Sequence, residues 1–158
     1  SIPSFPSLTI KPYTEFKNEP GGIFMESSRS NVLDDYADLI RQKSFKDKEV
    51  LNLCENLGKS LKDNSNNQVR KFYDGLRTIA RRDKVDHYVQ LTLYKSRVMY
   101  SSARRGGINS QLRDFLVKSL NVILEKEQKG MPKALQDFAE YFEAVYGYYY
   151  CYTSKENR

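Results

Sequence analysis

The fold class and the charge distribution of this chain are decided by residues 66–107, which read NNQVRKFYDGLRTIARRDKVDHYVQLTLYKSRVMYSSARRGG. This stretch holds ten Lys or Arg against three Asp, a balance of +7, whereas the whole chain of 158 residues has a formal net charge of +6. The remaining residues therefore sum to −1, so one stretch carries all of the net positive charge. Such a concentration of cations predicts an anionic partner, and nucleic acid is the commonest one.

The first half of this stretch has the pattern of an amphipathic helix. Its apolar residues recur with helical spacing and lie on one side: Val69, Phe72, Tyr73, Leu76, Ile79 and Ala80. Ser65 or Asn66 can cap the start, and Gln68 would complete a capping box with Ser65. We therefore expect a helix that buries one face against the rest of the chain.

A row of arginines lies on the other side of this helix. Arg70, Arg77 and Arg81 fall together there, with Asp74 among them and Lys71 at the flank. A charged stripe of this kind is most often a solvated surface. Three arginines with little acidic compensation favour phosphate binding instead.

The second half of the stretch, from about Lys84 to Arg105, predicts another helix, with Asp83 as its N-cap. One apolar side comprises Tyr88, Leu91, Tyr94 and Val98, and a second comprises Val89, Leu93 and Tyr100. A helix that is apolar on two sides is usually buried between neighbours. We therefore expect this helix to be the central one.

The polar residues of this second helix divide between two directions. Arg97, Tyr100 and Arg104 share one narrow sector, whereas Lys95 points nearly the opposite way. The helix ends at Arg104 and Arg105, which precede a glycine pair. Because the helix dipole alone favours cations at a C-terminus, the arginine pair fits a structural role as well as a ligand-binding one.

The rest of the chain predicts four more helices and an arm. Their start signals are Ser30 or Asn31, then Asp47, Asn109 and Pro132. Residues 1–30 hold four of the five prolines and a glycine pair, which predicts an extended arm with a short strand at 8–10. Either the arm's own bundle or a neighbouring subunit could hold it. The sequence therefore predicts an all-α fold, a compact bundle of about six helices over residues 31–158 with an extended N-terminal arm over residues 1–30.

The residues that catalysis or metal binding would need are missing. His87 is the single histidine and has no Ser or Cys partner in a motif. Glu140 and Glu143 lack an accompanying Glu-x-x-His motif, and the glycine pair at 106–107 lacks the Gly-Lys-Ser/Thr of a phosphate loop. We therefore predict no catalytic residues, no metal site, no cofactor and no enzyme activity.

The composition favours a cytoplasmic protein. The chain has no apolar run of about 18 residues and no signal-peptide pattern, so we expect no membrane span. Cys54 and Cys151 are distant from each other and lack metal-ligand spacing, which favours reduced thiols.

The C-terminal helix is rich in tyrosine. Five tyrosines crowd its last turns: Tyr146, Tyr148, Tyr149, Tyr150 and Tyr152. Tyrosines on every side of a helix cannot all face one small core. We expect Tyr148 and Tyr152 to be buried between subunits, and base stacking is the alternative.

Three motifs in this order resemble a known family. They are the helix start from Gln68 to Phe72, the run of Lys95, Arg97, Tyr100 and Arg104, and the final helix from Phe138 to Tyr149 with Phe142. Together they resemble the small subunit of type III-A CRISPR effector complexes, the Csm small-subunit family, over about residues 64–153. The chain departs from the family at Ser96, where proline is common.

The resemblance implies a non-catalytic RNA-binding subunit in antiviral defence. Members sit in several copies beside the RAMP-fold backbone subunits and the large subunit, and they hold target RNA and the crRNA–target duplex by sequence-independent phosphate contacts. Charge and resemblance together predict these RNA-binding residues: Arg70, Lys71, Arg77, Arg81, Lys95, Arg97, Tyr100, Arg104 and Arg105.

Two other functions fit parts of the sequence. A helical DNA-binding protein would need exposed side chains that reach base edges, and Asn66, Asn67 and Gln68 are candidates. A protein-interaction adaptor would explain the tyrosine-rich end and the arm, but not the basic stretch.

Overall fold

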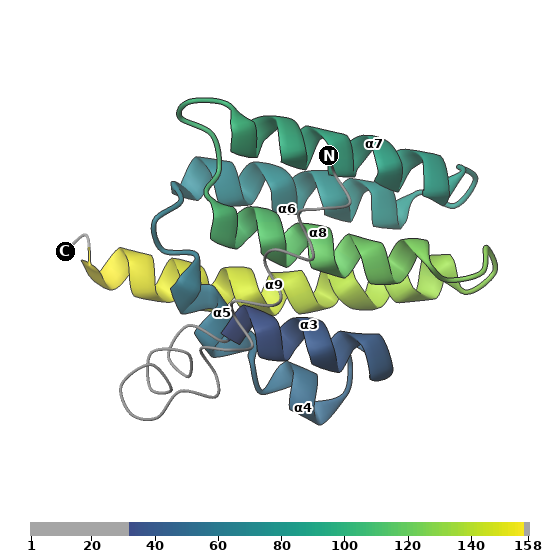
Figure 1. The fold of residues 1–158 in the computed structure, drawn as a ribbon, viewed down its shortest axis with the longest axis horizontal. Helices are drawn as coiled ribbons and strands as arrows, with labels where there is room; N and C mark the ends of the chain where they lie inside the picture. The colour runs from purple at the N-terminus through teal and green to yellow at the C-terminus, as the bar shows by residue number, and fades with distance from the viewer. Residues whose placement is uncertain (1–31, 157–158) are drawn as a thin grey trace, which may run out of the picture. The chain divides into compact units, whose positions relative to one another are not determined.

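The structure is a computed structural model that describes residues 32–156 (Figure 1). Residues 1–31 and 157–158 lie outside the described part. The expected arm over residues 1–30, its strand and the helix cap at Ser30 or Asn31 also lie outside it, so the domain boundary stays a prediction.

The described residues form helices joined by turns, with no strand among them, so the predicted all-α fold is confirmed. In chain order the helices are α3 (Val32–Gln42), α4 (Lys48–Leu51), α5 (Cys54–Ser60), α6 (Asn66–Arg81), α7 (His87–Ala103), α8 (Ser110–Leu124) and α9 (Met131–Glu156). They occupy the six expected segments, because α4 and α5 share the second one. Leu53 N donates to Val50 O at 3.1 Å, and this tighter turn separates α4 from α5.

The core is built around α9, which contacts α5, α6, α7 and α8. Its inward face is a run of buried side chains: Leu135, Phe138, Tyr141, Phe142, Val145 and Tyr149. Phe115 of α8 packs between two of them, with ring centroids 5.6 Å from Phe138 and 5.4 Å from Phe142. Figure 1 shows α9 crossing the middle of the helices, with α6, α7 and α8 on one side and α3 and α4 on the other.

The expectation that the second helix of the basic stretch is central is wrong. This helix, α7, lies at the edge, beside α6 and α8 (Figure 1). Leu91 and Val98 are buried, but Val89 is 46% exposed and Leu93 is 52% exposed. Only one of its two apolar sides is covered, because the longer aromatic stripe of α9 already fills the middle of the bundle.

Three N-caps lie where the sequence predicts them. Asp47 caps α4 and Asn109 caps α8, each through its side chain. Ser65 caps α6, and Gln68 completes the capping box. These caps fix where the described helices begin, because each satisfies backbone N–H groups that the first turn leaves without partners.

Two helix starts differ from the prediction. Asp86 caps α7, rather than Asp83, and its carboxylate accepts from Val89 N at 3.2 Å. The residues between them form a bend, in which His87 Nε2 lies 2.9 Å from Arg82 O. At α9 the helix begins at Met131, so Pro132 occupies the second helical position rather than the first. Both helix starts still use residue types that are favoured at N-termini. They differ from the prediction by one to three positions, which the sequence alone does not fix.

Buried tyrosine hydroxyls tie the helices together. Tyr94 donates to Phe72 O at 2.6 Å, Tyr141 donates to Val50 O at 2.6 Å, and Tyr149 donates to Asn64 O at 2.5 Å. Each bond joins two helices, or a helix and a turn, that are far apart in sequence. Several tyrosines are therefore core residues, because their rings fill the bundle while a backbone carbonyl satisfies the hydroxyl.

Candidate nucleic-acid interface

A groove between α6 and α7 gathers four of the predicted RNA-binding residues. It encloses a cavity of ≈ 420 Å³. Its lining residues come from both helices: Lys71, Phe72, Gly75, Tyr94, Arg97, Tyr100, Ser101 and Arg104. Lys71 thus lies with the α7 residues, and not with the arginine row of its own helix. We call this cavity and its lining the α6–α7 groove.

The floor of the α6–α7 groove is apolar and fixed. The Phe72 and Tyr94 rings meet edge to face with centroids 6.0 Å apart, and the Tyr94 hydroxyl is held by the Phe72 carbonyl. A Cβ at Gly75 would lie 3.5 Å from the Tyr94 ring, which is an ordinary van der Waals contact. Both rings are buried, so the floor belongs to the core of the bundle. Burial raises the pKa of Tyr94 well above its usual range, although the charge of Arg97 acts in the opposite direction. Its hydroxyl therefore stays protonated and continues to donate.

The rim of the α6–α7 groove is cationic. Arg97 Cζ lies 5.9 Å from the Tyr94 ring centroid, and Arg104 Cζ lies 5.9 Å from that of Tyr100. Lys71 Nζ lies 5.9 Å from the Phe72 ring centroid on the α6 side. None of the lining residues carries a carboxylate, so the walls of the groove do not neutralise these three charges.

The turn after α7 is packed closely, and this positions Arg104. Gly106 has a φ of 79°, in the left-handed region that favours glycine. A Cβ at Gly107 would lie 1.6 Å from Ser101 O, so no larger residue fits there. Gln68 Nε2 donates to Gly106 O at 2.6 Å and links this turn to the start of α6. Arg105 is exposed in the same turn but does not line the groove.

Two of the three arginines of the predicted row line a different groove, between α6 and α9. Arg77 and Arg81 line a cavity of ≈ 290 Å³ together with Glu140 and Glu143. Arg70 Nε lies 3.9 Å from a carboxylate oxygen of Asp74, and an Arg77 nitrogen lies 3.7 Å from the other oxygen. The row therefore has acidic neighbours that the α6–α7 groove lacks.

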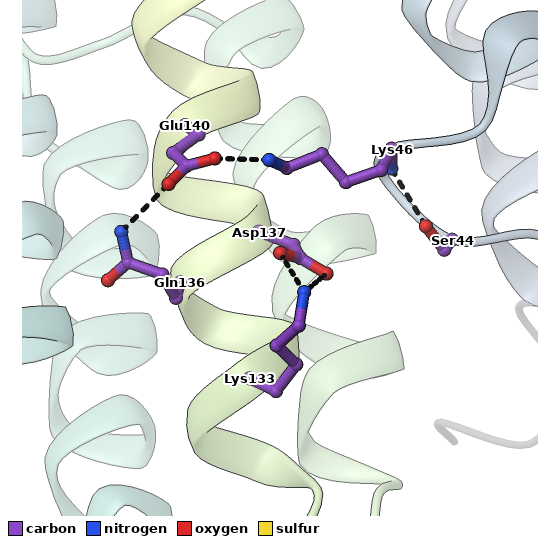
Figure 2. Close-up of polar contacts among 6 residues, drawn as sticks. All are labelled: Ser44, Lys46, Lys133, Gln136, Asp137 and Glu140. Atoms are coloured by element: carbon purple, nitrogen blue, oxygen red, sulfur yellow. Dashed lines mark hydrogen bonds and ion pairs between the residues drawn. The ribbon is translucent and has the colours of Figure 1, made fainter.

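The Glu140 side of this second groove is already engaged within the chain. Figure 2 shows Lys46 reaching Glu140 from the turn between α3 and α4, while Gln136 Nε2 donates to the other carboxylate oxygen at 3.1 Å. The bond from Lys46, followed by that from Gln136, lowers the pKa of Glu140. One turn earlier on α9, Lys133 Nζ donates to both oxygens of Asp137 (Figure 2). The Lys46–Glu140 ion pair joins the α3–α4 turn to α9 and favours the ionised form of Glu140 beside the arginines.

Lys95 is separate from both grooves. Its ammonium group donates to Asn121 Oδ1 of α8 at 2.7 Å. The side chain thus bridges α7 and α8, on the side of α7 away from Arg97 and Arg104. The position that the family pattern groups with these arginines therefore makes a contact within the bundle.

Two of the three side chains proposed for reading DNA bases already make hydrogen bonds within the chain. Gln68 serves the capping box and the turn at Gly106. Asn66 Oδ1 accepts from the Tyr146 hydroxyl at 3.1 Å, so of the three only Asn67 is exposed. This arrangement disfavours base readout at the start of α6.

The C-terminal tyrosines divide into packed and exposed groups. Tyr149 is buried, and the Tyr152 hydroxyl donates to a carboxylate oxygen of Glu55 on α5. That bond, more than burial, raises the pKa of Tyr152 to about 12. Tyr148 is 41% exposed and Tyr150 is 57% exposed. Of the two tyrosines expected at a subunit interface, Tyr152 therefore has a partner within its own chain.

The aromatic floor of the α6–α7 groove was not among the predicted site residues. The signal for it is the i, i+3 pair Phe72 and Gly75 on α6, facing Tyr94 and Ser101 on α7. Within the described residues, no group of three or more His, Cys, Asp or Glu could hold a metal ion. No helix in the same part of the chain is long and apolar enough to cross a membrane.

One protein-family model matches this chain. The family is described as Csm2 Type III-A, and the match covers residues 44–155, which include both grooves. No curated protein and no solved structure matches the chain. Because the match spans well over half of the sequence, the chain belongs to the Csm2 Type III-A family, the small subunit of type III-A CRISPR Csm complexes.

Proposed function

We propose that this chain is a non-catalytic RNA-binding subunit that holds target RNA and the crRNA–target duplex through the phosphate backbone. One observation carries this proposal: Lys71, Arg97 and Arg104 surround one groove whose lining includes no carboxylate. Arginine and lysine at such a site bind phosphate oxygens by charge-assisted hydrogen bonds that do not depend on the base. In a guided complex, base pairing supplies the sequence specificity.

The remaining predicted residues take secondary places in this proposal. The row of Arg70, Arg77 and Arg81 meets RNA more weakly, because Asp74 and Glu140 offset part of its charge. Arg105 extends the cationic rim from the neighbouring turn. Lys95 acts mainly through Asn121 of α8 and is the least involved.

The partners in this proposal are those of a type III-A effector in the cytoplasm. The chain lies beside RAMP-fold backbone subunits, the large subunit and additional copies of itself, and it contributes shape and charge. Chemistry on the target belongs to the other subunits. The exposed tyrosines Tyr148 and Tyr150 suit contacts with neighbouring chains, because tyrosine is favoured at protein interfaces.

The test is target-RNA retention by the assembled complex. The double reversal Arg97→Glu/Arg104→Glu should lose most target RNA, while the complex still assembles. The control is Lys126→Glu/Lys129→Glu, which changes the net charge equally on the exposed turn between α8 and α9. Equal retention by the two assembled variants would contradict the proposal.

A further inference from the structure

We propose that Gln68 is a positioning residue for RNA binding. Its side-chain amide fixes the turn after α7, and that turn sets where Arg104 and Arg105 meet the RNA backbone. This inference rests on the proposed function and adds how the cations at the end of α7 are held beside Lys71 of α6.

Arg104 and Arg105 lie beyond the last residue of α7. The helix ends at Ala103, and Arg104 is its C-cap, with an extended backbone at φ −89° and ψ 143°. Arg105 follows in the turn and is exposed. The helix alone therefore does not determine the directions of these two side chains, which depend on the conformation of the turn.

The turn itself is rich in glycine. Gly107 N donates to Arg104 O at 3.0 Å and closes a turn of four residues. Gly106 is its third residue and has a φ of 79°, as in a type II turn. Glycine loses more conformational freedom on folding than any other residue. A turn with two adjacent glycines therefore needs contacts with other parts of the chain to keep one conformation.

These contacts come from two directions. After the turn, Ile108 is buried and its N–H donates to Ser101 Oγ at 3.2 Å. Within the turn, Gly106 O accepts from Gln68 Nε2 at 2.6 Å. Among the described residues, no other hydrogen bond joins α6 to residues 104–108. The Gln68 amide is therefore the polar link between the start of α6 and the turn that carries the arginines.

The capping box holds the Gln68 side chain in place for this link. Gln68 Oε1 accepts from Ser65 N at 3.2 Å, while Gln68 N donates to Ser65 Oγ at 3.2 Å. The cap uses only the oxygen of the side-chain amide, so its nitrogen can donate to Gly106 O. Glutamate also forms capping boxes at this position, but an ionised carboxylate has no hydrogen to donate.

The link affects the α6–α7 groove because Gln68 and Lys71 are neighbours on α6. They are three residues apart, so they lie on the same side of the helix. Lys71 lines the groove from α6, and Arg104 lines it from the end of α7. Joining Gln68 to the residue two positions after Arg104 therefore keeps the cations of the two elements together, where one RNA strand can contact both.

The experiment measures the affinity of the full chain for a single-stranded RNA of about 12 nucleotides by fluorescence anisotropy. The first comparison controls for charge. Gln68→Glu keeps the capping box and loses the donor to Gly106, whereas Asn67→Asp adds the same charge at the exposed neighbouring position. We expect Gln68→Glu to bind about fivefold more weakly than Asn67→Asp, as for the loss of one hydrogen bond.

The second comparison controls for capping. Gln68→Met and Ser65→Ala each remove part of the capping box without changing the charge, and only Gln68→Met also loses the bond to Gly106. Gln68→Met should again bind about fivefold more weakly than its match. Circular dichroism confirms that each variant folds.

A third measurement shows whether Gln68 acts through the arginines. In the background Arg104→Ala/Arg105→Ala, the further change Gln68→Met should cause no additional loss of affinity, because the side chains that the turn positions are gone. A loss as large as in the unaltered chain would overturn the inference, since Gln68 would then act on RNA by another route.

The remaining outcomes are distinguishable. Equal affinities within both pairs would confine Gln68 to capping α6 and overturn the inference, while the proposed function would stand. A difference in only one pair would trace the effect to charge or to capping and would also overturn it. Failure of the unaltered chain to bind the RNA would contradict the proposed function itself, and this inference with it.

Discussion

Asn64 connects more distant parts of the chain than its place in a turn suggests. The Asn64 side chain is buried. Its Nδ2 donates to Asn109 Oδ1 at 2.9 Å, and its Oδ1 accepts from Asn109 N at 2.9 Å. Its backbone carbonyl accepts the Tyr149 hydroxyl. One side chain and one carbonyl thus join the start of α6, the cap of α8 and the end of α9.

We expect Asn64→Ala to lower the free energy of unfolding by about 2 kcal/mol, because it removes both side-chain hydrogen bonds to Asn109 and leaves the part-buried Asn109 N–H without its acceptor. The control Asn67→Ala, three residues later and exposed, should change it by less than about 0.5 kcal/mol. Urea unfolding followed by circular dichroism measures both. Similar stabilities for the two variants would show that the Asn64 network is dispensable.

The ion pair of Lys46 and Glu140 predicts a pH dependence. The pKa of Glu140 is lowered in the folded chain by its bonds to Lys46 and Gln136. A carboxyl with a lowered folded-state pKa stabilises the fold above its unfolded-state pKa, and this contribution disappears as the pH falls through the folded-state value. Glu140→Gln should therefore reduce stability at pH 7 and not in acid.

Unfolding measurements at pH 7 and at about pH 2 check this expectation. Glu127→Gln, which removes an exposed carboxyl from the α8–α9 turn, is the matched control and should show no such difference. A loss of stability in Glu140→Gln that is equal at both pH values would mean that packing, rather than charge, accounts for the effect.

At the scale of elements, one glycine sets how closely α5 approaches α9. A Cβ at Gly58 would lie 2.7 Å from Tyr148 Cβ and 2.8 Å from Tyr149 N. The second of these atoms is backbone and cannot move aside without shifting α9. Gly147, in contrast, faces open space among the described residues.

We expect opposite effects from the same substitution at these two glycines. Gly58→Ala should destabilise the chain by about 1–3 kcal/mol through overpacking. Gly147→Ala should stabilise it by up to about 1 kcal/mol, since alanine is the better helix former. Thermal unfolding of both variants decides the matter, and a Gly58→Ala chain as stable as the unaltered one would contradict the close approach.

Local signals in the sequence predict the elements well. The stripes of α6, α8 and α9 and the caps at Asp47, Ser65 and Asn109 depend on residues within a few positions of one another, so spacing alone reveals them. Gly58 shows the limit, because nothing local marks it as the glycine that meets another helix. The edge position of α7 is not predictable for the same reason. Two apolar sides on a helix do not tell how many other helices pack against it.

The candidate site was predictable in composition and not in arrangement. Arg97, Tyr100 and Arg104 were expected to share a sector of one helix, and all three line one groove, although Arg104 is the C-cap of α7 rather than part of the helix. Lys71 lines the same groove only because α7 packs against the side of α6 that carries Lys71. A helical-wheel projection of one helix cannot show this packing. The engagement of Lys95 with Asn121 likewise depends on where α8 lies.

At the scale of the whole molecule, the exposed tyrosines predict association between copies. Tyr148 and Tyr150 lie exposed near the end of α9, so replacing both by Ser should leave helicity intact and weaken self-association. The control Tyr88→Ser changes a tyrosine of similar exposure at the start of α7. Sedimentation at several concentrations measures the effect, and unchanged association of the double variant would exclude this surface.

The distribution of charge bears most directly on function. The basic stretch presents two sets of three cations. One set comes from both α6 and the neighbouring α7, and the other comes from α6 alone. The two sets differ in the acidic residues around them. Lys71, Arg97 and Arg104 line a groove without carboxylates. The row of Arg70, Arg77 and Arg81 has Asp74 and two glutamates nearby.

The salt dependence of RNA binding tests the central claim that the α6–α7 groove is the principal phosphate site. Each phosphate contact with a single strand contributes about 0.7 to the slope of log affinity against log salt concentration. The variant Lys71→Ala/Arg97→Ala/Arg104→Ala should lower that slope by about 2, because it removes three contacts. The matched variant Arg70→Ala/Arg77→Ala/Arg81→Ala should lower it by less. An unchanged slope in the first variant, or an equal or larger loss in the second, would contradict the account.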